Sequence, residues 1–143
     1  MKIRVAVAGA SGYTGGELLR ILSRHPKVHL TAATSRGAAG QPVEAVFPSL
    51  RGLVPLTFNA LEPDRLAQPA DVIMSALPHR ASMEPVARWL RAGRKVVDLS
   101  ADYRLKEAET YARVYATPHL HPELLAEAVY RSEERRVGKE CRL

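Results

Sequence analysis

Apolar and polar residues near the start of the chain predict a buried strand followed by a helix. Residues 3–8 (IRVAVA) end in a continuous apolar run, which is typical of a parallel strand covered on both faces. Leucines then recur at helical spacing from Thr14 onward, at Leu18, Leu19 and Leu22. That stripe predicts a helix with one apolar face.

The turn between this strand and this helix carries three evenly spaced glycines, Gly9, Gly12 and Gly15. Free N–H groups at a helix start point toward one place, and the helix dipole favours negative charge there. The turn therefore predicts a phosphate site, with polar groups added by Ser11, Tyr13 and Thr14. The spacing is G-x-x-G-x-x-G rather than G-x-G-x-x-G. A tight turn without a ligand is the alternative interpretation.

Further apolar runs predict a sheet of parallel strands. Strands are expected at 28–34, 71–76 and 95–99, with an edge strand at 53–58 because it contains Pro55. The stripe between the last two full strands (Met83, Val86, Ala87 and Leu90) predicts a helix that ends at Gly93. Glu84 and Arg88 are expected to pair on its outer face. The alternation predicts an α/β fold, a Rossmann-like doubly wound parallel sheet.

Shorter elements are predicted in the remaining segments. Helical turns are expected at 43–47 and 62–66, a helix at 106–115, and a short helix from 122 to 128 that begins with a proline. Residues 128–130 predict the start of one more strand.

The end of the second strand indicates which dinucleotide would bind. NAD enzymes carry an acid there for the ribose 2′-hydroxyl, whereas an arginine accommodates the 2′-phosphate of NADP. No acid occurs between Glu17 and Glu44, and Ser35 and Arg36 follow the strand directly. The pair predicts NADP, because a guanidinium presents a fork of donors to phosphate. A solvated surface arginine is the alternative.

Polar residues also follow the later strands. Leu77, Pro78 and His79 lie after the strand at 71–76, at the carboxyl edge where ligands of open α/β sheets bind. His79 has a structural alternative as a helix cap. After the next strand, Asp98, Asp102 and Arg104 form either an ion pair or a polar wall of the site; the pattern leaves both open.

Composition narrows the function classes. The chain has 143 residues, a net charge of +6 and one cysteine, which fits a single cytoplasmic domain without a disulfide framework. No run is long enough to span a membrane, and no dense basic block predicts nucleic-acid binding. His119 and His121 have no carboxylate or cysteine partner at ligand spacing, so no metal is expected. Residues 131–143 hold eight charged residues and are expected to form a disordered tail after a domain at 1–130.

Taken together, the motifs resemble N-acetyl-γ-glutamyl-phosphate reductase of arginine biosynthesis over about residues 2–130. The resemblance is carried in order by GASGYTGGEL (9–18), TSR (34–36), ALPH (76–79), DLSADYRL (98–105) and HPELL (121–125). It implies that NADPH reduces an acyl phosphate to an aldehyde through a cysteine thiolate. It also implies that Gly9, Ser11, Gly12, Tyr13, Thr14 and Gly15 hold the pyrophosphate, and Ser35 and Arg36 the 2′-phosphate. Leu77, Pro78 and His79 would lie along the cofactor, and Ser100 near the nicotinamide.

The chain departs from this family at Arg131. The family's Asn-Pro-Gly-Cys motif does not occur, and Cys141 stands in a different context, so no catalytic cysteine is assigned. We expect that the chain is truncated before the second, catalytic α+β domain, and that it binds NADPH without turning over substrate. The full-length family member would be a homo-oligomer. A related aminoadipyl-phosphate reductase of lysine biosynthesis and a non-catalytic NADP-binding module are the alternatives.

Overall fold

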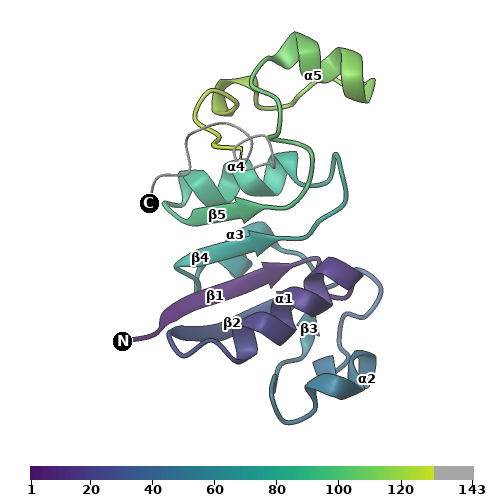
Figure 1. Cartoon of the computed structure of the whole chain (residues 1–143), viewed down its shortest axis with the longest axis vertical. Helices are drawn as coiled ribbons and strands as arrows, with labels where there is room; N and C mark the ends of the chain where they lie inside the picture. Colours follow the sequence, from purple (N-terminus) through teal and green to yellow (C-terminus); the bar gives the residue numbers. More distant parts are fainter. Residues whose placement is uncertain (131–143) are drawn as a thin grey trace, which may run out of the picture.

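The computed structural model describes residues 1–130, which form a five-stranded parallel sheet with helices on both faces (Figure 1). The strand order is β3-β2-β1-β4-β5. The strands are β1 (Ile3–Ala8), β2 (Val28–Thr34), β3 (Phe58–Asn59), β4 (Val72–Ser75) and β5 (Lys95–Asp98). The predicted Rossmann-like α/β fold is confirmed. Because the order reverses between β1 and β4, a crevice for ligands is expected at the carboxyl ends of these two strands.

The helices alternate with the strands along the chain. They are α1 (Tyr13–Ser23), α2 (Val43–Val46), α3 (Pro63–Ala67), α4 (Met83–Arg91) and α5 (Ala108–Tyr115), with short 3-10 turns η1 (Pro48–Leu50) and η2 (Pro122–Leu124). Within residues 1–130, no helix combines the length and the apolar character needed to cross a bilayer.

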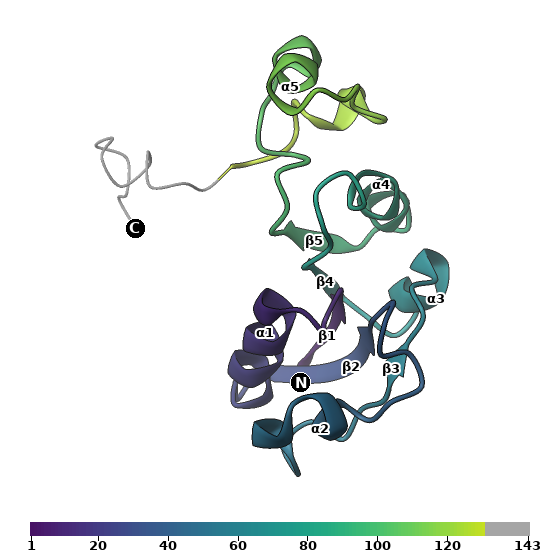
Figure 2. The ribbon, with the colours of Figure 1, turned by 90° about the vertical axis from the view of Figure 1, so that its right-hand side faces the viewer.

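Two apolar clusters cover the two faces of the sheet, and β1 contributes to both. Val7 packs in the cluster that contains Leu19 of α1, whereas Ala6 and Ala8 pack in the cluster that contains Trp89 of α4. Figure 2 shows α1 on one side of β1 and the helices α3 and α4 on the other. Full burial of a side chain such as Leu19 contributes about 2 kcal/mol. The alternating small and large residues of β1 thus let helices approach both faces.

The predicted edge strand at 53–58 is wrong in extent, because only Phe58 and Asn59 pair with β2. The preceding residues fold back on their own loop instead: the N–H of Leu56 donates to the carbonyl of Val54, at 2.8 Å. The N–H of Val43 in turn donates to the carbonyl of Leu56. These local bonds leave a two-residue strand at the sheet edge.

Two predictions about α4 are also wrong. Leu90 is 40% exposed, and the neighbouring Trp89 is fully buried in its place. The helix is rotated so that Trp89 packs toward α3. Glu84 and Arg88 do not pair with each other, because distant partners lie closer. The carboxylate of Glu84 lies 2.6 Å from Nε2 of His121, and Arg88 forms an ion pair with Asp64 of α3.

The last described segment is less regular than predicted. The helix expected at 122–128 is a single 3-10 turn, Pro122–Leu124, and no strand begins at 128–130. These residues follow α5, and the last strand of the described sheet along the chain is β5 (Figure 1). The predicted disordered tail at 131–143, with Cys141, lies outside the described residues.

Candidate functional site

The glycine turn after β1 is built by two glycines that no other residue can replace without a shift of backbone. Gly9 has φ +72°, and a Cβ there would lie 2.6 Å from the carbonyl oxygen of Ala76. A Cβ on Gly15 would lie 2.5 Å from Cα of Ala10. Gly9 therefore lets β4 approach the turn, and Gly15 lets α1 approach it.

Gly12 differs from these two glycines, because it has room for a Cβ without a close contact. A Cβ there would have Gly9 O as its nearest neighbour, at 3.9 Å. Gly12 is the N-cap of α1, no side chain caps the helix, and its first turn carries no acid. The first bond of the helix runs from Gly16 N to Gly12 O at 2.8 Å. The N–H groups before Gly16 thus have no intrahelical acceptor, and they fit an anion such as a pyrophosphate.

The end of β2 is joined to this turn. The N–H groups of Gly9 and Ala10 donate to the hydroxyl and the carbonyl of Thr34, at 3.3 and 2.7 Å. The hydroxyls of Ser11 and Ser35 lie 2.7 Å apart, so the structure brings these two predicted site residues together. Ser35 is buried, and its hydroxyl also accepts from Ala38 N.

Arg36 is exposed directly after Ser35. Because the Ser35 hydroxyl is already engaged with Ser11 and Ala38, it positions the loop. The guanidinium of Arg36 is the group at this strand end that fits an additional phosphate.

The segment after β4 forms the opposite side of the glycine turn. The backbone of Ala76 and Leu77 lies against Gly9, as the close approach at Gly9 shows. Pro78 is exposed and His79 is partly buried. Arg80 follows with φ +70°, a left-handed conformation that residues with a side chain rarely adopt.

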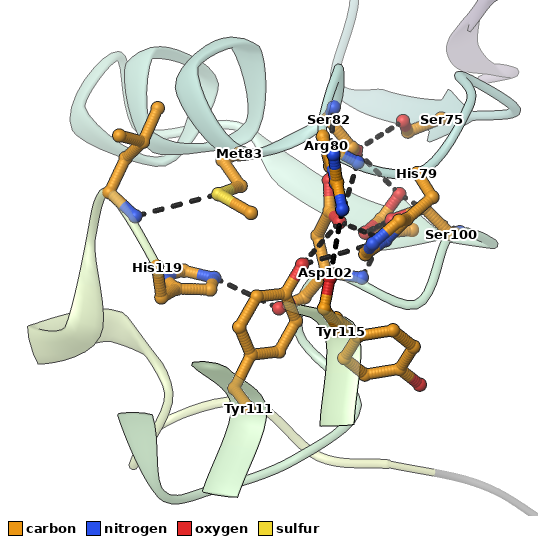
Figure 3. Close-up of polar contacts among 12 residues, drawn as sticks. Ser75, His79, Arg80, Ser82, Met83, Ser100, Asp102, Tyr111, Tyr115 and His119 are labelled. Atoms are coloured by element: carbon orange, nitrogen blue, oxygen red, sulfur yellow. Dashed lines mark hydrogen bonds and ion pairs between the residues drawn. The ribbon is translucent and has the colours of Figure 1, made fainter. Parts of the chain in front are cut away.

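Asp102 is the centre of a buried hydrogen-bond network below this segment (Figure 3). Its carboxylate is fully buried and accepts three hydrogen bonds. Oδ1 accepts from the N–H of Arg80 at 2.8 Å and from the hydroxyl of Tyr111 at 3.0 Å, and Nδ1 of His79 lies 2.8 Å from the same oxygen. Oδ2 accepts from the N–H of Ser82 at 3.1 Å. Several donors compensate the lost hydration of the buried charge.

His79 is therefore held from one side. Nδ1 of His79 lies 2.8 Å from Oδ1 of Asp102 and 3.5 Å from the hydroxyl of Tyr111. Nε2 of His79 is buried and has no hydrogen-bond partner in the part of the chain that the structure describes. The rings of Tyr111 and Tyr115 lie beside the imidazole, with centroids at 6.0 and 4.7 Å.

Ser100 is occupied by hydrogen bonds on both sides. Its hydroxyl donates to Oδ2 of Asp98 at 2.6 Å and accepts from the N–H of Asp102 at 3.0 Å. Ser82 also donates to Asp98, at 2.7 Å. Asp102 thus belongs to a structural network and not to an ion pair with Arg104, whose guanidinium lies 5.4 Å from the ring centre of Tyr130.

Sequence reasoning assigned no role to Tyr111 or His119, although both contact Asp102. Nε2 of His119 donates to the carbonyl of Asp102 at 2.9 Å, and Nδ1 accepts from the N–H of His121 at 3.0 Å. Burial lowers the pKa of His119, and burial also raises the pKa of Tyr111 well above its usual range. The proline-flanked His-x-His pattern was a signal for a rigid loop but not for this contact. Residues 1–130 contain no cluster of three metal-binding side chains.

A hollow of the described surface lies elsewhere, beside the first residues of β2 and the end of α1. It measures about 530 Å³ and is lined by residues such as Leu22, Val28 and Leu56. Ligands of parallel sheets bind at the carboxyl ends of the strands, and this hollow has no helix start or glycine turn. We therefore place the site at the glycine turn.

Residues 4–128 match the family model described as "Semialdehyde dehydrogenase, NAD binding domain". The match covers most of the chain and includes every element of the site described above. The chain belongs to this family of nucleotide-binding domains, and its cofactor is a nicotinamide dinucleotide.

Curated relatives refine the resemblance. The chain is 54% identical over 128 residues to an N-acetyl-gamma-glutamyl-phosphate reductase of Citrifermentans bemidjiense. The aligned residues cover 90% of this chain and 37% of that protein. It is 51% identical over 129 residues to a [LysW]-L-2-aminoadipate/[LysW]-L-glutamate phosphate reductase of Saccharolobus solfataricus, with the same coverage. The chain thus spans just over a third of the length of these relatives.

A solved structure supports the fold. Aspartate semialdehyde dehydrogenase with NADP from Candida albicans superposes with a TM-score of 0.65 at 21% identity, over 76% of this chain and 32% of that one. The likeness shows that both chains share the arrangement of sheet and helices.

Proposed function

We propose that this chain is the NADP-binding part of an N-acetyl-γ-glutamyl-phosphate reductase. The observation that carries the proposal is the start of α1 without a side-chain cap at the β1–β4 switch, with room for a Cβ at Gly12. The 54% identity to a reductase of that name supports the reaction. The pyrophosphate would be held by the turn residues Gly9, Ser11, Gly12, Tyr13, Thr14 and Gly15. Leu77, Pro78 and His79 would line the dinucleotide, and Ser100 would lie near the nicotinamide end.

The proposed reaction converts an acyl phosphate into an aldehyde and releases phosphate. NADPH supplies the hydride when it is bound. The contribution of this chain is to bind and orient the dinucleotide, because its sequence contains no Asn-Pro-Gly-Cys motif to supply the thiolate. We therefore expect the 143-residue chain to bind NADPH and not to turn over substrate.

Two relatives suggest two different substrates for the full-length enzyme. Both relatives are named as phosphate reductases, and they differ in the acyl group that carries the phosphate. The identity is 54% to the acetylglutamyl enzyme and 51% to the aminoadipate enzyme. The acetylglutamyl substrate is favoured, and the aminoadipate-type substrate is the second candidate.

The preference for NADP over NAD is supported by the end of β2. No acid occurs at residues 18–43, and Arg36 is exposed beside the engaged pair of Ser11 and Ser35. An acid would repel the 2′-phosphate, whereas the guanidinium can donate two hydrogen bonds to it.

Calorimetric titration of the 143-residue chain with NADPH and NADH tests the proposal. We expect NADPH to bind more tightly, and Arg36→Ala to weaken NADPH at least about tenfold while NADH is unchanged, since a charge-assisted hydrogen bond contributes about 1.5–3 kcal/mol. Arg24→Ala, an exposed arginine at the far end of α1, is the matched control and should change neither affinity.

Equal affinity of the wild type for both dinucleotides would refute the NADP assignment. A separate assay follows NADPH absorbance with N-acetyl-γ-glutamyl phosphate added to the purified chain. Turnover in that assay would refute the expectation that the chain binds without catalysis.

A further inference from the structure

The turn between β4 and α4 is held in a conformation that it would not adopt alone. Arg80 has φ +70°, which is sparsely populated by residues with a Cβ. Such conformations persist only where the surroundings fix them, and they cluster at functional sites.

The carboxylate of Asp102 binds this turn at two points. Its Oδ1 accepts from the N–H of Arg80 at 2.8 Å and its Oδ2 from the N–H of Ser82 at 3.1 Å. Ser82 is the N-cap of α4, and its own side chain makes no cap hydrogen bond. Asp102 therefore supplies an acceptor for the N–H of the N-cap residue from a different strand end, and its negative charge lies where the helix dipole favours it.

Asp102 itself has little freedom to move. Its N–H donates to the hydroxyl of Ser100 and its carbonyl accepts from His119. The hydroxyl of Tyr111 donates to the same carboxylate oxygen that binds Arg80 N. Figure 3 shows these groups converging on Asp102 from α5, the loop after it and the end of β5. The carboxylate is thus a fixed anchor and the turn is the part that is held.

The turn that Asp102 holds is one side of the candidate nucleotide site. Its first residues lie in contact with Gly9, since a Cβ on Gly9 would meet the carbonyl oxygen of Ala76 at 2.6 Å. A displacement of this turn would therefore change the space in front of the glycine turn. Asp102 acts on that space only through the turn.

We propose that Asp102 is a positioning residue of the nucleotide site, whose carboxylate holds the turn at residues 77–82 against the glycine turn. The inference rests on the proposed function, because it takes a nicotinamide dinucleotide to bind between these two turns. Nothing in the hydrogen bonds of Asp102 requires direct contact with the dinucleotide.

The test combines two substitutions and a titration with NADPH. Asp102→Asn keeps the shape but replaces one acceptor by a donor that faces an N–H group, and we expect it to weaken NADPH about tenfold. Arg80→Gly in the Asp102→Asn background should restore affinity to within about threefold of the wild type, because glycine adopts a positive φ without strain. A purely structural role of Asp102 would lower the melting temperature without this rescue of binding.

Asp64→Asn is the control, since it removes the same charge from an exposed ion pair with Arg88 and should leave NADPH affinity unchanged. If Asp102→Asn binds NADPH as tightly as the wild type, the positioning role of Asp102 is overturned and the proposed function stands. Absence of NADPH binding in the wild type would refute the proposed function itself.

Amide hydrogen exchange in the wild-type chain tests the positioning role of Asp102 without any substitution. This measurement is the deciding one in the case that the Asp102→Asn variant does not fold. Slow exchange at the N–H groups of Arg80 and Ser82 is expected, because both are bound to a buried carboxylate. Exchange at the rate of an open loop would overturn the inference.

Discussion

Two glycines of the turn after β1 are expected to have different roles. Gly15 would be required for packing and Gly12 for phosphate binding, and an alanine substitution at each position tests this difference. In Gly15→Ala the new Cβ would lie 2.5 Å from Cα of Ala10 and 2.6 Å from the carbonyl oxygen of Gly9. Both neighbours are backbone atoms, so α1 must move away from the turn. In Gly12→Ala the nearest atom, the same Gly9 oxygen, is 3.9 Å away, and the fold has room for the methyl group.

The size of the Gly15→Ala effect follows from two opposing terms. Overpacking against backbone costs about 3 kcal/mol or more, and the better helix propensity of alanine offsets about 1 kcal/mol. The free energy of unfolding should fall by about 2 kcal/mol. With an unfolding entropy of roughly 2.1 cal/mol/K per residue, this corresponds to a melting temperature lower by roughly 7 °C.

Gly12→Ala should change the free energy of unfolding by less than about 1 kcal/mol, the usual range for an N-cap glycine replaced by alanine. It should nevertheless weaken NADPH about tenfold or more, because the methyl group occupies space beside the N–H groups that would bind phosphate. Thermal melts by circular dichroism and calorimetric titrations measure the two effects. A Gly15→Ala protein that melts with the wild type would refute the packing argument, and unchanged NADPH affinity in Gly12→Ala would refute the placement of the phosphate.

Two further predictions concern stability. Trp89→Phe should lower the free energy of unfolding in urea by about 1–3 kcal/mol, because it leaves a void and removes the indole donor to the carbonyl of Pro63. The control is Leu90→Ala at the exposed neighbouring position, which should lower that free energy by less than about 1 kcal/mol. An equal loss of stability in both variants would contradict the observed rotation of α4. Burial lowers the pKa of His119 below its ordinary 6.5, so the unfolded chain binds the proton more readily and stability should fall as the pH drops below about 6.5. His119→Gln should flatten that pH dependence in urea unfolding, and an unchanged slope would show that His119 is not responsible.

The predictable parts of the molecule were those whose signals are local. The strand at 28–34 was predicted with its observed bounds, and the glycine turn marked the junction of β1 and α1. Such elements depend on apolar runs and on glycine geometry, which a sequence displays directly.

The misjudged parts depend on contacts between distant segments. The helical stripe of α4 fits either Trp89 or Leu90 as its buried member, and only the position of α3 decides between them. The partners of Glu84 and Arg88 come from the loop after α5 and from α3. Spacing along one helix carries no information about such neighbours.

Asp102 shows the same limit within the site. The sequence left its role open between an ion pair and a polar wall. Its partners are two backbone N–H groups about twenty residues earlier and side chains from α5 and from the turn after β4. Backbone donors have no sequence signature, so only the fold identifies this network.

An NMR titration shows residue by residue whether a nicotinamide dinucleotide binds at the glycine turn. Two-dimensional ¹H–¹⁵N spectra of the labelled chain are recorded while NADPH is added. We expect the largest chemical-shift changes at the amides of Gly12, Tyr13 and Thr14 and at those of Leu77 and His79. Shifts concentrated instead around the hollow near Leu22, Val28 and Leu56, or no shifts at saturating NADPH, would contradict binding at the glycine turn.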